Sequence, residues 1–384
     1  MREAVIVEGI RSAIGRRNGA LKNIRPDDMA GEILKGLIKK SGVNPGYVDD
    51  VILGCVTQSG EQAGDIARLS ALIAGFPVEV PGTTIDRQCG SSQQAVHFAA
   101  QAILSGDMDI VIAGGVENMS RVPIGSNYGG AGFSEILKGQ HEIIHQGLSA
   151  ERIAIKFGIS REEMDQFAYE SHQKAFNAQK DGRFQEEILP LQVPGNEGGT
   201  ILFNKDEGPR PETTVDILSN LKPAFREDGM IHAGNSSQIS DGAAALLLMS
   251  REKAEEFGLK ARFKVHTRVV TGSDPTLMLT GPIPATRKVL DKSGLSINDI
   301  DVFEVNEAFA PVAIAWLKEL KADPARLNPN GGAIALGHPL GASGARIMVT
   351  MMNELERTGG RFGLQTMCEG HGMANATIIE RLGS

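Results

Sequence analysis

The chain has 384 residues, more than one hydrophobic core usually organises, so two or three domain-sized units are expected. Hydrophobic residues make up 41% and charged residues 22%, which is typical of a folded enzyme and excludes long disorder. The net charge of −8 disfavours a dedicated nucleic-acid binder, which needs a basic face to neutralise phosphates. No apolar run approaches the roughly 20 residues that span a bilayer, and no signal-peptide core precedes the first predicted strand. We therefore expect a soluble, cytoplasmic protein without a membrane span.

Short β-branched runs alternate with helical apolar stripes along the chain. Buried strands are predicted at 5–7, 51–53, 110–113 and 245–249. A helix is predicted between the first two strands, around 30–38, and another follows Cys89 at 93–104. The apolar face of this second helix is predicted to hold Ala95, Phe98, Ala99, Ala102 and Ile103. The alternation predicts an α/β layered fold with mainly parallel strands.

The segment 119–239 differs from the rest, because loop-like stretches surround a single strong helix that begins after Ser160. We interpret it as an insertion that covers a site. It contains His141-Glu142-Ile143-Ile144-His145, which matches the H-E-x-x-H pattern of zinc proteases. Gly139 and Gly147 bracket the match closely and no third ligand stands at a known spacing, so we reject a zinc site and expect no metal.

An internal repeat is suggested by Ser41-Gly42-Val43, which recurs as Ser293-Gly294-Leu295, 252 residues later. At the same offset the predicted strand at 110–113 falls on another apolar run, and Glu117 falls on Glu369. A duplication predicts two similar core halves, formed by 1–118 plus 240–259 and by 260–384, with 119–239 inserted in the first. Equivalent loops of the two halves would then share one side of the molecule.

Cys89 is the best candidate nucleophile among the three cysteines, whose odd number and spacing indicate no disulfide framework. It precedes a predicted helix, where the positive end of the helix dipole favours a thiolate. The alternative is a small buried residue at a strand end. Cys55 lies within an apolar strand, and we assign it to the core.

His338 and Cys368 lie in two further loops with unusual glycine content. The histidine follows Gly331-Gly332-Ala333-Ile334-Ala335-Leu336-Gly337, and Cys368 precedes Glu369-Gly370-His371-Gly372. Two thiols and an imidazole on strand-end loops suggest covalent acyl chemistry with a second proton-transfer group. Zinc is disfavoured because there is no C-x-x-C pair, and a dinucleotide fingerprint is absent.

Asn306 opens the run Asn306-Glu307-Ala308-Phe309-Ala310 before a predicted helix. A helix N-cap is a sufficient explanation for it. A catalytic carboxamide that positions water or an oxyanion is the alternative.

In chain order, four motifs resemble those of the thiolase family, the acyl-CoA C-acyltransferases: Gln88-Cys89-Gly90-Ser91, the run that begins at Asn306, the glycine-rich loop that contains His338, and Cys368-Glu369-Gly370. The resemblance extends over essentially the whole chain. It implies a duplicated five-layer α-β-α-β-α fold with an inserted loop domain. It also implies reversible thiolysis of 3-ketoacyl-CoA, or Claisen condensation of acetyl-CoA, through an acyl group on a cysteine. No tightly bound cofactor is implied, since coenzyme A and acyl-CoA are substrates, and a homodimer or homotetramer is expected.

The resemblance also implies residue roles. Cys89 attacks the thioester, His338 takes its proton, and Cys368 exchanges a proton with the α-carbon. Asn306 holds a water for one oxyanion, and the backbone amides of Cys89 and Gly370 bind the other. Coenzyme A is expected along the inserted segment, at His145, Arg210, Phe225, Ala233, Ser237 and Phe309, with Met278 on the pocket wall.

Two residues depart from the family pattern. His371 stands where the family often has glycine, and Gln146 replaces a frequent methionine. Because of these two changes, the resemblance does not define the preferred acyl chain length. The sequence does not define the direction of the reaction either. A decarboxylating ketoacyl synthase is the nearest alternative, but Cys368 and the N-E-A-F-A run argue against it. A non-catalytic acyl-CoA-binding relative would be expected to lose one of the reactive residues, and all are present.

Overall fold

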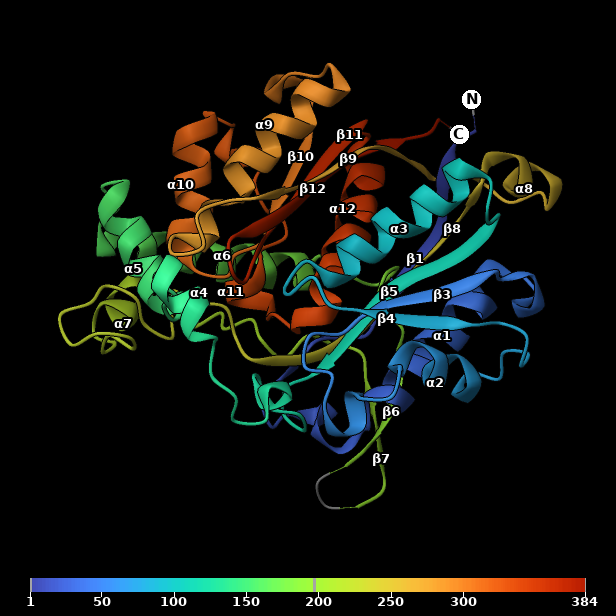
Figure 1. Ribbon diagram of the computed structural model, residues 1–384, viewed down its shortest axis with the longest axis horizontal. Helices are drawn as coiled ribbons and strands as arrows, with labels where there is room; N and C mark the ends of the chain where they lie inside the picture. Colours follow the sequence, from blue (N-terminus) through green and yellow to red (C-terminus); the bar gives the residue numbers. More distant parts are fainter. Residues whose placement is uncertain (1, 196–197, 384) are drawn as a thin grey trace.

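The computed structural model describes residues 2–195 and 198–383 (Figure 1). One ten-stranded sheet has the order β10-β11-β12-β9-β1-β8-β5-β3-β4, with the short β2 (Gly15–Arg16) paired to β8. The N-terminal half of the sheet consists of β1 (Ala4–Arg11), β3 (Asp50–Gly54), β4 (Gly82–Ile85), β5 (Ile110–Asn118) and β8 (Ser240–Ser250). The C-terminal half consists of β9 (Phe263–Gly272), β10 (Val302–Val305), β11 (Phe362–Glu369) and β12 (Met373–Arg381).

Among the described strands, the two halves of the sheet meet where β1 pairs with β9 over two residue pairs, Val5–Lys264 and Ile6–Phe263. From this junction outwards, the order β1-β8-β5-β3 is equivalent to β9-β12-β11-β10, and the N-terminal half adds β4 at its edge. The duplication predicted from the sequence is confirmed, because equivalent elements recur at the 252-residue offset. Helix α1 (Pro26–Ser41) and α9 (Pro282–Ser293) both end before a left-handed glycine with φ of 73°. Helices α3 (Ser91–Ser105) and α12 (Ser343–Thr358) likewise begin 252 residues apart.

Five layers follow from the packing of these helices (Figure 1). Helices α1 and α2 (Ile66–Ile73) cover the outer face of the N-terminal half. Helices α9 and α10 (Ala310–Leu320) cover the outer face of the C-terminal half. Helices α3 and α12 form the middle layer and bury apolar residues of both halves between them. The predicted α/β layered fold is therefore confirmed.

The strand directions differ from the prediction of a mainly parallel sheet. Among the named strands of the described chain, the parallel pairs are β3–β4, β3–β5 and β10–β11, and the other pairs are antiparallel. Strands β11 and β12 pair antiparallel because three residues, Gly370 to Gly372, join them, and a connection this short cannot return a strand in parallel. Strand β8 pairs antiparallel with both β5 and β1 after the long inserted segment returns the chain to the sheet.

The segment between β5 and β8 holds more regular structure than the single helix expected from the sequence. It contains α4 (Glu135–Gln140), α5 (Gln146–Lys156), α6 (Arg161–Lys180), the hairpin β6 (Leu191–Pro194) and β7 (Thr200–Phe203), and α7 (Val215–Ser219). Helices α5 and α6 pack on α10. Leu191, Val193 and Phe203 join the core beneath α1, so the segment contributes to the core as well as covering it.

Helix α3 buries small residues such as Ala95, Ala99 and Ala100, because it lies between two halves of the sheet. Phe98, which we expected on the same face, is instead exposed.

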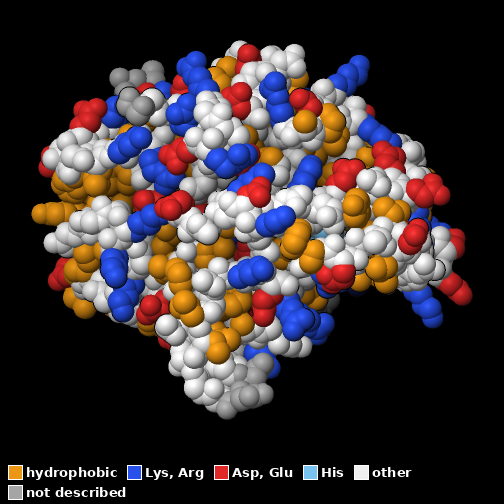
Figure 2. Space-filling view, turned by 180° about the vertical axis from the view of Figure 1, so that it is seen from behind, with side chains coloured by type: hydrophobic (Ala, Val, Ile, Leu, Met, Phe, Trp, Pro, Cys, Tyr) orange, Lys and Arg blue, Asp and Glu red, His pale blue; other side chains and the backbone are white. Residues whose placement is uncertain are grey.

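Two short helices complete the fold. Helix α8 (Arg251–Glu256) follows β8, and α11 (Ala333–Leu336) lies just before His338. Within the described residues, no helix combines the length and apolarity needed to cross a membrane. On the face opposite to that of Figure 1, basic and acidic side chains are intermixed (Figure 2).

Burial of His97 in α3 gives a testable pH dependence. Its Nε2 lies 2.7 Å from Thr377 Oγ1, and burial lowers the pKa of His97 from 6.5 to about 3. The unfolded chain therefore takes up a proton below pH 6.5 that the folded chain does not, so stability falls as the pH drops from about 6.5 towards 3. In His97→Gln the acid slope of the unfolding free energy should shrink by about 1.4 kcal/mol per pH unit. Urea unfolding at pH 7, 6 and 5 measures it, and an unchanged slope contradicts the burial of a neutral imidazole.

Candidate active site

One large cavity, of about 960 Å³, lies between the strand ends and the inserted segment. Cys89, His338 and Gly370 line it. All seven residues expected to contact coenzyme A line it too: His145, Arg210, Phe225, Ala233, Ser237, Met278 and Phe309. Asn306 and Cys368 do not line the cavity but are buried directly behind it, where Cys368 packs with Met278, Ala308 and Phe309. The structure thus brings together Cys89 and Gly370, which are 281 positions apart in the sequence.

Cys89 occupies a strained turn between β4 and α3. Gln88 has φ of 49°, a left-handed conformation that is unfavourable for a residue with a side chain. Ser91 stabilises the turn, since its Oγ accepts from the Arg87 N–H at 2.8 Å and donates to the Gln88 carbonyl at 2.6 Å. A Cβ on Gly90 would lie 2.1 Å from Glu369 Oε1, so a larger residue after the cysteine would have to displace this buried carboxyl group. The turn directs Cys89 towards the cavity.

The electrostatics at Cys89 differ from the expectation of a stabilised thiolate. Burial raises the pKa of the Cys89 thiol well above its usual range, and the neighbouring Cys368 and Glu369 raise it further when they are ionised. The position before α3 does not outweigh this desolvation. The resting group is therefore a neutral thiol, which needs a base in order to attack.

His338 is a neutral base with a defined tautomer. Its Nδ1 lies 2.6 Å from Ser343 Oγ, and this hydroxyl donates its single proton to the Pro339 carbonyl at 2.8 Å. The proton of the imidazole must then be on Nδ1, which leaves Nε2 as an acceptor. Burial lowers the pKa of His338 to about 3, so the ring is uncharged at neutral pH.

Cys368 lies near the end of β11, and burial raises its pKa to about 12, while a hydrogen bond with Asn306 opposes the shift. The interpretation of Asn306 as a helix cap is wrong, because α10 begins at Ala310 with Phe309 as its N-cap. Asn306 instead directs Nδ2 towards His338 Nε2 at 3.4 Å. Its Oδ1 is buried without a hydrogen-bond partner in the described part of the chain. The side chain therefore lies between the imidazole and the second thiol.

Glu117 organises the loops around the cavity, a role that the sequence did not reveal. Its buried carboxylate accepts hydrogen bonds from the backbone N–H groups of Val56, Thr57 and Gly341 at 2.9–3.0 Å and from Gln62 Nε2 at 2.7 Å. Gly341 belongs to the histidine loop of the C-terminal half, so one carboxylate connects both halves. In the sequence, Glu117 was distinguished only as the residue that lies 252 positions before Glu369, at the offset of the internal repeat.

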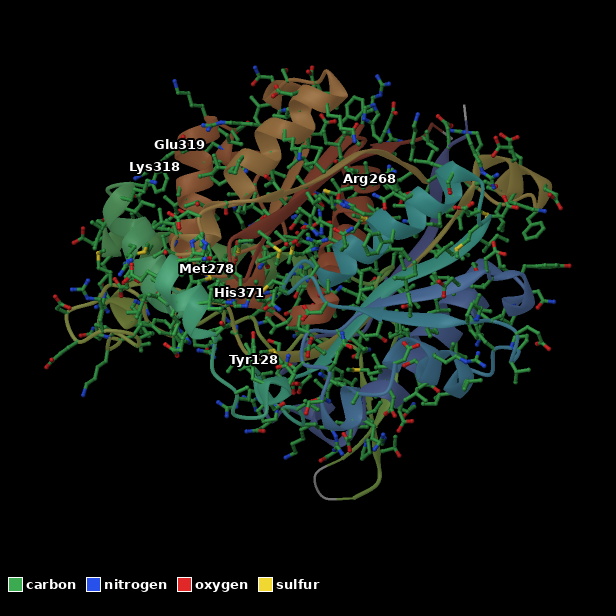
Figure 3. The ribbon with its side chains drawn as sticks, in the orientation of Figure 1. Tyr128, Arg268, Met278, Lys318, Glu319 and His371 are labelled. Carbon is green, nitrogen blue, oxygen red and sulfur yellow. The ribbon has the colours of Figure 1, made fainter. Side chains whose placement is uncertain are left out.

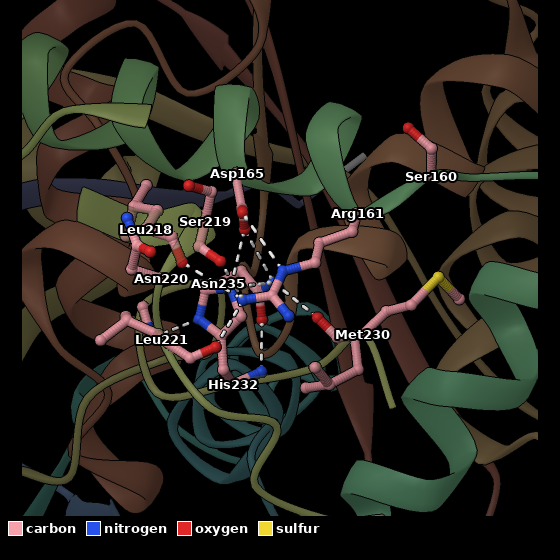
Figure 4. Close-up of polar contacts among 12 residues, drawn as sticks. Ser160, Arg161, Asp165, Leu218, Ser219, Asn220, Leu221, Met230, His232 and Asn235 are labelled. Carbon is pink, nitrogen blue, oxygen red and sulfur yellow. Dashed lines mark hydrogen bonds and ion pairs between the residues drawn. The ribbon is translucent and has the colours of Figure 1, made fainter. Parts of the chain in front are cut away.

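A buried polar network positions the loop that carries Ala233 and Ser237 (Figure 4). Asp165 of α6 accepts from Asn235 Nδ2 at 3.1 Å and lies 2.8 Å from His232 Nε2. The carbonyl of Asn235 accepts from the Ala310 N–H at 2.9 Å, which joins this loop to the first residue of α10. These contacts depend on tertiary packing and carry no local sequence signal.

Aromatic rings and arginines line the outer part of the cavity. His145 stacks on Phe225 at 5.1 Å between ring centroids, and Phe225 meets Phe309 edge-on at 5.8 Å. The H-E-x-x-H segment is not helical, because α4 ends at Gln140 and α5 begins at Gln146, and Glu142 pairs with Arg152. Among the lining residues that the sequence did not reveal are Arg16, Arg17, Tyr128 and Phe133, which come from segments without a motif. Met278, His371 and Tyr128 lie near one another in Figure 3.

The burial pattern predicts the order in which the thiols react. Cys89 lines the cavity, whereas Cys55 and Cys368 do not, so iodoacetamide should modify Cys89 first. Because the pKa of Cys89 is raised, the rate should keep increasing above pH 9 as the thiolate fraction grows. Peptide mapping after timed alkylation measures both. A plateau near pH 7, or earlier modification of Cys368, would contradict the neutral-thiol assignment.

Comparisons with known proteins give matches along nearly the whole chain. Residues 4–252 match the family model described as "Thiolase, N-terminal domain", and residues 259–381 match "Thiolase, C-terminal domain". A steroid 3-ketoacyl-CoA thiolase of Mycobacterium tuberculosis is 52% identical, over 100% of this chain and 95% of its own length. A beta-ketoadipyl-CoA thiolase of Acinetobacter baylyi is 44% identical over 100% of both chains. The crystal structure of the Bacillus anthracis acetyl-CoA acetyltransferase superposes with a TM-score of 0.92, at 41% identity, over 100% of this chain and 99% of that one.

Proposed function

The chain belongs to the thiolase family and is an acyl-CoA C-acyltransferase, and we propose that it forms and breaks the C2–C3 bond of 3-ketoacyl-CoA through an acyl group carried on Cys89. One observation carries the proposal. A thiol from the N-terminal half and a neutral imidazole from the C-terminal half line the same cavity, with a second thiol buried behind it.

The charge states of these groups define the first step of thiolysis. Cys89 Sγ attacks the 3-keto carbon while its proton passes to His338 Nε2, so that neither partner is charged beforehand. The C2–C3 bond then breaks, its electron pair forms the enolate of acetyl-CoA, and Cys368 donates its proton to the α-carbon. The high pKa of Cys368, about 12, keeps this proton on sulfur until a strong base such as an enolate appears.

The second step regenerates both thiols. The Cys368 thiolate takes the proton of incoming coenzyme A, whose sulfur attacks the acyl group on Cys89. The C–S bond to Cys89 breaks, and the released thiolate recovers its proton from His338. Condensation of two acetyl-CoA molecules is the same sequence in reverse.

Negative charge develops on two carbonyl oxygens during these steps. We assign a water held by Asn306, together with His338, to one of them, and the backbone N–H groups of Cys89 and Gly370 to the other. Donors fixed in a buried site lower such barriers by several kcal/mol. The Asn306–His338 distance of 3.4 Å and the exposure of Gly370 to the cavity support this assignment.

Coenzyme A fits the outer part of the cavity. Arg210, with Arg16 and Arg17, supplies cations for its phosphates, and arginine recognises phosphate well. His145, Phe225 and Phe309 offer aromatic surface, while Ala233, Ser237 and Met278 complete the wall. The segment 119–239 thus serves as the coenzyme A-binding part of the chain, between the two core halves. We further propose that the enzyme acts in the cytoplasm as a homodimer or homotetramer.

Covalent catalysis at Cys89 predicts that incubation with acetyl-CoA adds one acetyl group to residue 89. The variant Cys368→Ala should still accept this acetyl group, because acylation uses His338 rather than Cys368. It should lose thiolysis and condensation by ~10²–10⁴, the usual contribution of a general acid–base. Mass spectrometry and steady-state rates measure the two effects. Acetylation of Cys368 alone, or near-normal turnover without it, would overturn the assignment.

The role of Asn306 predicts a loss of turnover in Asn306→Asp. A carboxylate at this buried position places negative charge beside a developing oxyanion. We expect turnover to fall at least ~10-fold, or about 1.4 kcal/mol of transition-state stabilisation. Asn306→Ala should lose turnover as well while circular dichroism shows a folded protein. Wild-type turnover in both variants would leave Asn306 without a part in the chemistry.

A further inference from the structure

His371 has an unusual backbone conformation for its residue type. It is the middle residue of the turn between β11 and β12, and its φ of 64° lies in the left-handed region. This conformation costs a side-chain-bearing residue on the order of 1 kcal/mol relative to glycine. The flanking Gly370 is at the reacting centre, so the imidazole lies one residue from the thiol chemistry.

Two aromatic side chains from a different segment hold the imidazole in place. Tyr128 Oη lies 3.4 Å from His371 Nε2, and the Phe133 ring meets the imidazole edge-on at 5.5 Å between centroids. Tyr128 and Phe133 also contact each other edge-on at 6.0 Å. Phe133, Ile143 and His371 line both the central cavity and a second pocket beyond it, and we call the contacting pair His371 and Phe133 the partition.

This outer pocket has a volume of about 450 Å³. Its walls are mainly apolar, formed by Phe133, Leu137, His141, Ile143, Ser273, Pro275 and His371. None of these is a lysine or arginine, so a carboxylate carried into the pocket would find no permanently cationic side chain of these two types. An uncharged hydrocarbon chain or ring matches this lining, because its apolar surface leaves water.

We propose that the outer pocket is a subsite for the distal part of a long or ring-bearing, uncharged 3-ketoacyl group, and that the partition decides which acyl groups reach it. This inference rests on the proposed function, which places the acyl carbon at Cys89. A short acyl group stays on the inner side of the partition. A longer one must pass between His371 and Phe133, whose side chains come from separate segments and meet edge-on.

Two variants open the partition from opposite sides. His371→Gly keeps the left-handed backbone without strain and removes the imidazole, and Phe133→Ala removes the ring. The specificity ratio, kcat/KM for 3-ketodecanoyl-CoA divided by that for acetoacetyl-CoA, should rise at least ~10-fold in each. The dissociation constant of decanoyl-CoA relative to acetyl-CoA, measured by calorimetry, should fall in the same variants. Ile124→Ala is the matched control, because Ile124 lines the central cavity but not the outer pocket, and its ratios should change less than about threefold.

The outcomes separate the partition from the proposed chemistry. Unchanged specificity and binding ratios in both variants would overturn the partition. An equal loss with both substrates in His371→Gly alone would also overturn it, by making His371 part of the chemistry at Gly370. A third outcome is that the wild-type enzyme cleaves neither substrate while the binding ratio is still shifted in both variants. This outcome would refute the proposed function and would still support the subsite.

Discussion

The close contact between α3 and α12 is the constraint on which the active-site geometry depends. A Cβ on Gly344 would lie 2.4 Å from the Gln93 backbone nitrogen, and the Ala345 N–H donates to Ser92 Oγ at 2.8 Å. The first turns of the two helices therefore touch. Each helix is preceded by a reactive loop, with Cys89 before α3 and His338 before α12. Packing the two helix starts together brings a thiol and an imidazole from opposite halves of the duplication to one cavity.

The same burial sets the chemistry of these groups. Desolvation raises the pKa of both thiols and lowers that of His338, so all three groups are uncharged at rest. A preformed ion pair in this position would carry the desolvation cost of two charges. Neutral groups avoid that cost, and charge appears only when a substrate carbonyl is attacked, next to donors already in place.

Local sequence signals predicted the parts of the structure that depend on local chemistry. Buried strands such as 110–113 follow from β-branched runs. The resemblance carried by four motifs placed Cys89, His338 and Gly370 at one cavity, where the structure has them. Spacing alone gives neither contact distances nor pKa shifts, and the thiolate expected at Cys89 is instead a buried thiol.

Other features arise from tertiary packing, which a single sequence does not display. The N-E-A-F-A run looks like a helix start at Asn306, but Phe309 remains extended because its backbone bridges Ser236. The four N–H donors to Glu117 come from two segments, the connection between β3 and α2 and the histidine loop, so no local pattern identifies that residue. Likewise, the partition requires Phe133 and His371, which are far apart in the sequence, to meet.

The bond between Glu117 and the Gly341 N–H also bears on how the protein is made. A ribosome completes β5 and the Cys89 turn more than two hundred residues before it reaches the histidine loop. During that interval the inner face of the N-terminal half lacks α12, and the Glu117 carboxylate lacks one of its donors. The reactive thiol exists in the nascent chain, but its base does not. The centre therefore assembles only when the second half docks, so the emergence of a competent enzyme is tied to completion of the whole polypeptide.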